Sequence, residues 1–147
     1  MIKRVSAEEV LPLRALVLRE GRAIATAMFP KDDHPSTAHF AYILTGESVT
    51  VASVMKETHK SGTAKSYQLR GMATRPDCHG KGFGAQVLKA CLAYVQENDG
   101  DELWCNARVS ASGFYAANGF QKIDPEPFDI AGVGPHYQMH SVISPHS

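Results

Sequence analysis

The strongest constraint in this chain is a glycine-rich loop that lies between a strand-like run and a helix-like run. Glycine occupies every second position of this loop, at Gly80, Gly82 and Gly84. Because glycine has no Cβ atom, the backbone can turn tightly there and come close to a ligand. The helix that follows presents its unpaired N–H groups and the positive end of its dipole to the same place. With His79 and Lys81 as additional donors, the loop predicts a site for an anionic group such as a phosphate.

Two familiar phosphate-binding motifs do not fit this loop. The dinucleotide fingerprint G-x-G-x-x-G lacks its third glycine, because Val87 and Leu88 follow Gln86. The nucleotide P-loop requires Ser or Thr after Gly-Lys, whereas Gly82 follows Lys81 here. Taken alone, the loop therefore leaves two interpretations open: a phosphate site of another kind, or a connection between strand and helix with no ligand.

The charge balance argues against a polyanionic partner. Fifteen Lys and Arg residues match fifteen Asp and Glu residues, so we expect no nucleic acid and no membrane surface as a partner. The length of 147 residues predicts a single domain, residues 1–147, that can bury a core without disulfides. The three cysteines lack C-x-x-C spacing, and no run resembles a signal peptide or a membrane span. A cytoplasmic location is therefore expected.

The hydrophobic pattern predicts the order of strands and helices. Strands are expected at residues 2–5, 38–44, 48–57, 66–74, 103–107, 120–123 and 137–143. Helices are expected from the N-cap Ser6 to about Glu20, from the glycine loop to Asn98, and from Ser110 or Ser112 to Ala117. The irregular segment 22–37, with a short helix near 24–28, is expected to line a substrate pocket. This order predicts an α/β (α+β) fold with a mixed, mostly antiparallel central sheet of about seven strands flanked by helices.

The glycine loop belongs to a predicted crossover unit. The strand at 66–74, the loop, its helix and the strand at 103–107 follow one another directly. Such a crossover is right-handed, and its two strands lie parallel and adjacent. A ligand at the helix N-terminus would then occupy the crevice between these two strands, where open α/β sheets bind ligands.

Two stretches of the chain resemble the motifs of a known family, the GCN5-related N-acetyltransferases (GNAT). The run LRGMAT at residues 69–74, followed by HGKGFG at residues 79–84, looks like the family's acetyl-CoA motif Arg/Gln-x-x-Gly-x-Gly/Ala. The run NAR at residues 106–108, followed by FYAANGF at residues 114–120, looks like its second motif. Because the element order is also similar over the whole chain, the resemblance implies a GNAT-like acyl-CoA N-acyltransferase fold.

The resemblance implies acetyl-CoA as the donor substrate. The positions that would bind it are Met72, Ala73, Thr74, His79, Gly80, Lys81, Gly82, Phe83, Gly84, Ala85, Asn106 and Asn118. The family usually has Arg or Gln where this chain has His79. A neutral histidine is a weak donor to phosphate, so we expect acetyl-CoA affinity to fall as the pH rises past about 6.5. No metal is expected, because the seven histidines show no ligand spacing.

The chemistry of the thioester defines the catalytic groups to look for. A neutral amine attacks the carbonyl, an oxyanion forms, and the leaving thiolate needs a proton. Tyr115 stands where the family's motif places the general acid, although its spacing also suits a core aromatic residue. The donor that polarises the carbonyl is expected to be a backbone N–H near Met72.

The base and the acceptor remain open at this point. Glu57, His39 and His136 are candidates for the general base, and each can also be structural. The arginines of the first helix and its exit would suit an acceptor carboxylate, or a solvated face; they are Arg14, Arg19 and Arg22.

The expected activity is transfer of an acetyl group from acetyl-CoA to a primary amine. The acceptor would be a small molecule, an amino acid or a peptide, and the amine would attack directly in a ternary complex. The alternative is a non-catalytic acetyl-CoA sensor or regulatory protein. Dimers are common in the family, so a homodimer is compatible with this expectation.

Overall fold

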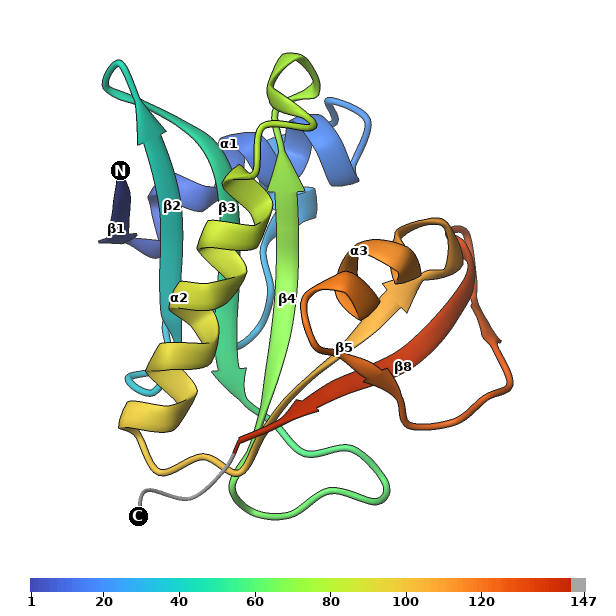
Figure 1. The fold of residues 1–147 in the computed structure, drawn as a ribbon. Coiled ribbons are helices and arrows are strands. Elements are labelled where there is room, and N and C mark those ends of the chain that lie inside the picture. The colour runs from blue at the N-terminus through green and yellow to red at the C-terminus, as the bar shows by residue number, and fades with distance from the viewer. Residues whose placement is uncertain (144–147) are drawn as a thin grey trace.

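The computed structural model describes residues 1–143 as an eight-stranded sheet with helices on both faces (Figure 1). The elements are β1 (Ile2–Val5), α1 (Ala7–Leu18), the 3-10 helix η1 (Ile24–Ala27), β2 (Ala38–Leu44), β3 (Glu47–Lys56), β4 (Ser66–Thr74), the 3-10 turn η2 (Pro76–Cys78), α2 (Phe83–Glu97), β5 (Glu102–Arg108), the 3-10 turn η3 (Val109–Ala111), α3 (Ser112–Ala117), β6 (Gln121–Lys122), β7 (Phe128–Ile130) and β8 (Gly134–Val142). The strand order is β1-β2-β3-β4-β5-β8-β6, and β7 pairs with β8.

The predicted fold class is confirmed, with one strand more than expected. All strand pairs are antiparallel except β4 with β5. The additional strand, β7, is three residues long and pairs with the start of β8 across a turn that contains Gly132. A strand this short forms only because β8 is there to pair with it, so its own residues carry no alternating pattern long enough to detect.

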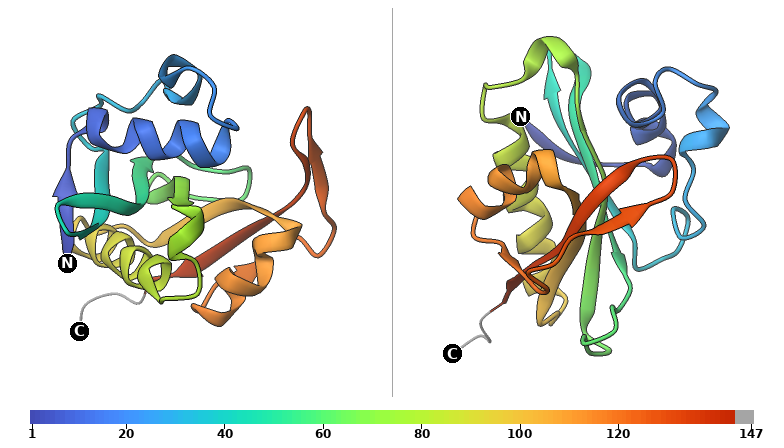
Figure 2. Two further views of the ribbon diagram at one scale, coloured as in Figure 1. Left: turned by 90° about the horizontal axis from the view of Figure 1, so that it is seen from above. Right: turned by 90° about the vertical axis from the view of Figure 1, so that its right-hand side faces the viewer.

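Each face of the sheet has its own layer of helices and its own core. Figure 2 shows α2 and α3 on one face and α1 with η1 on the other. The larger core lies under α2, where Val87, Leu88 and Cys91 meet alternate residues of the central strands. The smaller core lies under α1 and contains Val10, Leu13, Ala41, Val51 and Ala73. Because neighbouring residues of a strand point to opposite faces, the central strands supply side chains to both cores.

The strands β4 and β5 pair only near their starts. Parallel pairing joins Ser66 with Glu102 and ends where Gln68 meets Trp104, the last bridge between these strands among the described residues. The predicted parallel, adjacent arrangement is thus confirmed. Beyond Gln68, β4 continues along β3 while β5 and β8 turn toward α3 (Figure 1), so the sheet opens between its two halves.

A bulge in β4 accompanies this divergence. Ser53 of β3 pairs with Arg70, whereas Val51 pairs with Ala73, so the pairing register shifts at Gly71. The φ angle of Gly71 is +64°, in the left-handed region that glycine adopts without strain. A bulge bends the strand that carries the extra residue. The bend therefore directs the end of β4, and the glycine loop behind it, away from β5.

No helix among residues 1–143 combines the length and the apolar character that a membrane span requires.

Replacing Gly71 with alanine is expected to lower the free energy of unfolding by about 2–4 kcal/mol. An alanine there would be held at a positive φ, and its Cβ would lie 2.5 Å from Nε of Arg14. Urea unfolding of the Gly71→Ala variant measures this cost.

Gly46→Ala is the matched control, because Gly46 has a φ of +78° and a Cβ atom added there would meet nothing within 4 Å. Its expected cost is about 1–2 kcal/mol, from backbone strain alone. Equal losses in the two variants would show that the contact with Arg14 carries no cost.

Candidate active site

The glycine loop ends in a helix start whose backbone N–H groups face outward without a side-chain cap. Gly82 is the N-cap of α2 with a φ of +80°, and no side chain accepts a hydrogen bond from the first turn. The first internal hydrogen bond of the helix runs from the Gln86 N–H to the Gly82 carbonyl. The preceding N–H groups have no partner within the helix, so this end of α2 can accept an anion.

A cavity of about 320 Å³ lies between α2 and α3, on the same face. Its lining residues are Ala85, Gln86, Leu88, Lys89, Leu92 and Asn118. The structure thus brings together two predicted donor-binding residues, Ala85 and Asn118. Lys89 was not predicted, although helical spacing gives a signal for it, since it lies one turn beyond Ala85 on the same side of the helix.

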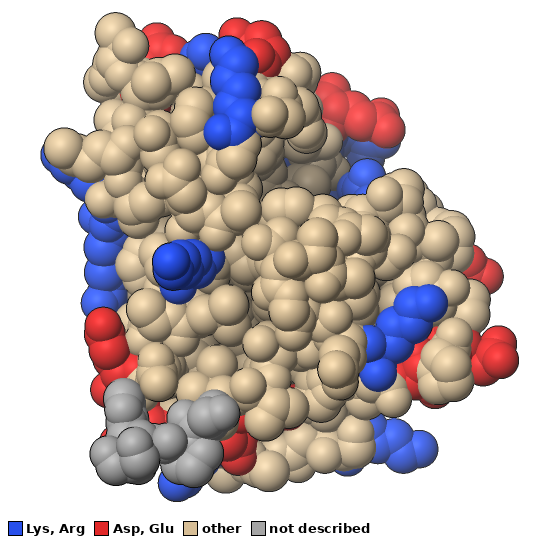
Figure 3. Space-filling view, viewed as in Figure 1, with Lys and Arg blue, Asp and Glu red and all other residues tan. Residues whose placement is uncertain are grey.

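Lys89 is one of few charged side chains on this face. Figure 3 shows the face with α2 and α3 as mostly uncharged, with scattered Lys and Arg. The predicted donors His79 and Lys81 are both exposed on the loop. A phosphate bound here would therefore depend on local donors, namely the α2 N–H groups and individual side chains, rather than on a broad positive surface.

The helix α3 approaches the glycine loop closely. A Cβ atom at Gly84 would lie 3.3 Å from the Phe114 ring and 3.7 Å from Cε of Met72. The distance of 3.3 Å to the Phe114 ring is shorter than most contacts of a Cβ atom. Glycine at this position therefore lets the start of α2 pack closely against α3. The end of β4, the glycine loop and α3 therefore meet at one place.

Tyr115 is buried beside this contact. Its ring lies 5.2 Å from that of Phe114 and 5.5 Å from that of Phe120, measured between centroids. Burial raises the pKa of the Tyr115 phenol above its usual value, so the group stays protonated at neutral pH. The phenol lies near the buried cysteines Cys91 and Cys105, and within residues 1–143 its hydroxyl forms no hydrogen bond.

Asn106, another predicted donor-binding residue, faces the side of the sheet opposite the cavity. Its neighbours Cys105 and Ala107 belong to the core under α2, so the alternation along β5 directs Asn106 to the opposite face, where it is exposed. Its role in donor binding stays a prediction.

Two of the three candidate bases are already engaged. His39 is buried, with Nδ1 2.6 Å from Oγ of Ser53 and Nε2 2.9 Å from the carbonyl of Asp32. Glu57 forms an ion pair with Lys31 at 2.5 Å. Both ring nitrogens of His39 and the charge of Glu57 therefore have structural partners.

His136 is arranged differently. Its Nδ1 lies 2.8 Å from the Gly134 carbonyl, which can only accept, so Nδ1 carries the proton and the neutral ring keeps a lone pair on Nε2. No residue in the described part of the chain forms a hydrogen bond with Nε2. His136 alternates with Tyr137, which packs on the α2-side core, so His136 faces the side of the sheet that carries α1.

On the α1 side, a buried ion pair organises the segment 22–37. Arg14 donates to Asp32 through both terminal nitrogens, at 2.8 and 2.9 Å, and also to the Ala27 carbonyl and Ser53 Oγ. Burial alone would raise the pKa of Asp32, but hydrogen bonds from Arg14 and the Phe29 N–H outweigh it and hold the pKa below its usual value. The ion pair thus fixes this segment against β3.

The contacts of the arginines in the first helix and its exit show which of these side chains could still bind a ligand. Arg14 is buried, and both of its terminal nitrogens are engaged by Asp32, the Ala27 carbonyl and Ser53 Oγ, whereas its Nε has no hydrogen-bond partner among the described residues. Arg19 donates to the carbonyls of Leu18 and Thr26. Arg22 is exposed and lies 4.0 Å from Glu20. Arg14 is therefore not placed to bind an acceptor carboxylate, because it is buried with both terminal nitrogens engaged. Nε and Nη1 of Arg19 are also used within the protein.

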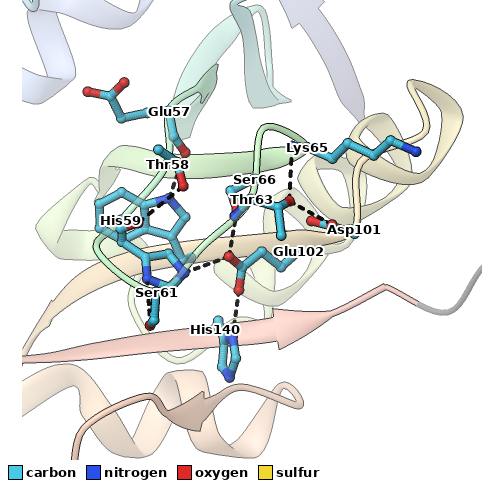
Figure 4. A network of polar contacts seen from close by, with 11 residues as sticks. Glu57, Thr58, His59, Ser61, Thr63, Lys65, Ser66, Asp101, Glu102 and His140 are labelled. Atoms are coloured by element: carbon cyan, nitrogen blue, oxygen red, sulfur yellow. Dashed lines mark hydrogen bonds and ion pairs between the residues drawn. The ribbon is translucent and has the colours of Figure 1, made fainter.

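A second polar cluster lies at the far end of the sheet and was not predicted. Glu102 of β5 accepts from Ser66 Oγ and contacts His59 Nε2 and His140 Nδ1, at 2.6, 2.5 and 2.6 Å (Figure 4). One nitrogen each of His59 and His140 and a carboxylate oxygen of Glu102 lie within 4.8 Å of one another, a spacing at which they could ligate a metal ion. Hydrogen bonds within the cluster already engage these atoms. The three residues come from a loop and two strands, so no sequence spacing could have linked them.

Comparison with known proteins agrees with this geometry. A family model described as an acetyltransferase (GNAT) domain matches residues 22–139. The chain is 29% identical over 143 residues to a Bacillus subtilis (strain 168) protein described as "Uncharacterized N-acetyltransferase YitI", covering 97% of this chain and 95% of that protein.

Solved structures share the fold at low sequence identity. An aminoglycoside 6'-N-acetyltransferase complexed with coenzyme A aligns with a TM-score of 0.78 and 12% identity, over 100% of this chain and 99% of that chain. A ribosomal-protein-alanine N-acetyltransferase from Brucella melitensis aligns with a TM-score of 0.76 and 14% identity, over 97% and 99%.

The Glu102 cluster generates a prediction about acid stability. Burial would raise the pKa of Glu102, but hydrogen bonds from Ser66, His140 and His59 outweigh it and lower the pKa. The stabilisation is therefore present above the unfolded value of 4.5 and is lost as the pH falls through the folded pKa. At pH 7, Glu102→Gln is expected to lower the free energy of unfolding by about 1–3 kcal/mol. Urea unfolding of wild type and Glu102→Gln at several pH values from neutral to acid measures this loss.

Glu126→Gln serves as the control, because Glu126 is exposed in the segment between β6 and β7. The difference in free energy of unfolding between wild type and Glu102→Gln should become smaller in acid, because the wild-type carboxyl also becomes neutral there. A difference that stays constant with pH would contradict the role of the Glu102 charge.

Proposed function

The chain belongs to the GNAT acetyltransferase family, and from this premise we propose that it moves the acetyl group of acetyl-CoA to a primary amine. Membership in the family makes it an acetyl-CoA-dependent N-acetyltransferase. The acceptor class we propose is a small molecule, an amino acid or a peptide. The proposed route is direct attack of the amine on the thioester in a ternary complex.

The donor side is supported by the elements that meet on the α2 face. We propose that the α2 N-terminus and the loop at Gly80 to Ala85 bind the pyrophosphate, and that Lys89 and Asn118 line the adjacent part of the site. Met72, Ala73 and Thr74 at the end of β4 would pair with the pantetheine arm. These backbone groups are free on the side toward β5, because no bridge joins the two strands beyond Gln68 in the described chain.

One observation carries the proposal: the sheet opens between β4 and β5 beside the glycine loop. A donor that lies along the α2 face can present its thioester in this opening. An acceptor can reach the same carbon from the α1 face, where Arg70 and His136 lie. The two substrates then meet without passing each other, which suits direct attack in a ternary complex.

The proposed chemical step needs one base and one acid. The neutral amine nitrogen forms a bond to the thioester carbon, and the C–S bond breaks as the oxyanion collapses. The Met72 N–H would stabilise the oxyanion, and Tyr115 would give its proton to the leaving thiolate. Of the three candidate bases, His136 is favoured as acceptor of the amine proton, because its Nε2 lone pair is free while His39 and Glu57 are engaged.

The experiment that tests this function is release of free thiol from acetyl-CoA in the presence of pooled primary amines. Release above the hydrolysis background is expected with at least one pool, and only when amine is present. The control is the same pool after chemical N-acetylation, which removes the nucleophile. Tight acetyl-CoA binding without release from any pool would contradict catalysis and favour a sensor or regulatory protein.

The proposed acid and base give a further prediction. Tyr115→Phe and His136→Gln are each expected to lower kcat by about 10²-fold or more, because each removes one proton transfer. Acetyl-CoA affinity, measured by calorimetry, should remain unchanged. Stopped-flow or steady-state thiol release gives kcat.

Tyr67→Phe is the matched control for Tyr115→Phe, because Tyr67 is also buried but lies at the paired end of β4. It should keep wild-type kcat. Full activity of Tyr115→Phe would show that another group, or water, protonates the thiolate.

A further inference from the structure

Arg70 lies on the acceptor side of the proposed reaction centre. It precedes the Gly71 bulge and lies two residues beyond Gln68, the last residue of β4 that pairs with β5. Its guanidinium lies over the ring of Phe29, which belongs to the segment that α1 and η1 hold on their face of the sheet. Arg70 is thus on the face opposite the donor cavity and beside the opening between the strands.

The Arg70 side chain is held in position by its contact with an anchored aromatic ring. Its Cζ atom lies 3.9 Å from the centroid of the Phe29 ring, and Cζ of Arg14 lies 4.2 Å from the same centroid. The N–H of Phe29 donates to Asp32 Oδ2 at 2.8 Å, so the ion pair that anchors Asp32 also anchors the ring. Stacking on a fixed ring orients a guanidinium while leaving its N–H edge free.

The local charges leave Arg70 without a counterion. The charges near Arg70 include Arg14 and Arg19 and the carboxylates of Asp32 and Glu57. Asp32 is paired with Arg14 at 2.8 Å, and Glu57 is paired with Lys31 at 2.5 Å. No carboxylate in residues 1–143 forms an ion pair with Arg70. Burial and the charge of Arg14 lower the pKa of Arg70, while the charges of Asp32 and Glu57 partly oppose this shift, and an arginine remains cationic at neutral pH. A partly desolvated cation that has no ion-pair partner favours the binding of an anion, because a charge-assisted hydrogen bond is strong.

We propose that Arg70 forms a carboxylate subsite, so that the acceptor is a primary amine that also carries a carboxylate. This inference rests on the proposed function for the identity of the reacting group, but the anion site itself follows from Arg70 and its surroundings. The guanidinium edge matches a carboxylate through two parallel N–H···O bonds. The surplus positive charge also disfavours the ammonium form of the acceptor, which helps to supply the neutral amine that attacks.

The test compares matched acceptors that differ only in the carboxylate. Amino acids, including ω-amino acids, are each paired with the corresponding amide, and thiol release gives kcat/KM for both members. The free acid is expected to exceed its amide by about 10- to 100-fold, the range for a charge-assisted hydrogen bond. Amides that serve as well as the acids would overturn the proposal.

The Arg70→Gln variant separates binding from structure. It should raise KM for the acid by about 10- to 100-fold, leave the amide nearly unchanged, and so remove the preference. Arg4→Gln is the matched control, because Arg4 is also stacked on a ring, at 5.3 Å from the centroid of Tyr94, but lies on the edge strand β1. An equal loss for acid and amide in Arg70→Gln would assign Arg70 a structural role and overturn the proposal.

A binding measurement keeps the inference independent of turnover. Thermal-shift assays with N-acetyl amino acids and their amides, in the presence of coenzyme A, should show protection by the acids that Arg70→Gln removes. If no amine releases thiol but this protection is found, the proposed function fails while the carboxylate subsite stands. Equal shifts for acids and amides, or no dependence on Arg70, would overturn the subsite even if acetyl transfer is observed.

Discussion

The divergence of β4 from β5 at the Gly71 bulge is the constraint on which the rest of the site depends. Parallel pairing stops at Gln68 and Trp104, and the register of β4 on β3 shifts at Gly71. The bend frees the backbone at the end of β4 and sets the glycine loop and α2 opposite α3. If β4 ran straight and paired with β5 along its whole length, the opening in the sheet would be closed. The bulge is held from behind, because the Arg14 side chain occupies the space where any Cβ of residue 71 would lie.

Arg14 therefore links the two sides of the site. Its side chain packs against Gly71 and binds Asp32, and Asp32 in turn holds the N–H of Phe29. A buried ion pair contributes little net stability, but losing one partner is costly, because the other charge remains buried. Here the pair has a further consequence: it fixes an otherwise irregular segment, and with it the aromatic ring on which Arg70 lies. The donor side depends on backbone geometry, whereas the acceptor side depends on this side-chain network.

Local patterns predicted most of the fold. The strands at 2–5, 38–44 and 66–74 have the expected bounds, and Ser6 caps α1 by accepting from the Glu9 N–H. β7 was missed, because a three-residue strand depends on its partner. In the site, α2 starts after Gly82 and one cavity is lined by both Ala85 and Asn118, while their role in donor binding stays a prediction. The free lone pair of His136 was not predictable, because the sequence does not show that Nδ1 binds the Gly134 carbonyl while no other described residue reaches Nε2.

By itself, the sequence indicated the fold class, and its resemblance to the GNAT motifs implied the donor. Glycine spacing, the start of a helix and the alternation of a strand act over a few residues, so they can be recognised without knowing what lies nearby. Only the tertiary structure decided which polar residues already have hydrogen-bond or ion-pair partners within the protein and which do not. Arg14, His39 and Glu57 are engaged, whereas Arg70 and His136 keep open positions. The physical reason is that a charge or a lone pair is used up by a partner distant in sequence, and packing alone brings the two together.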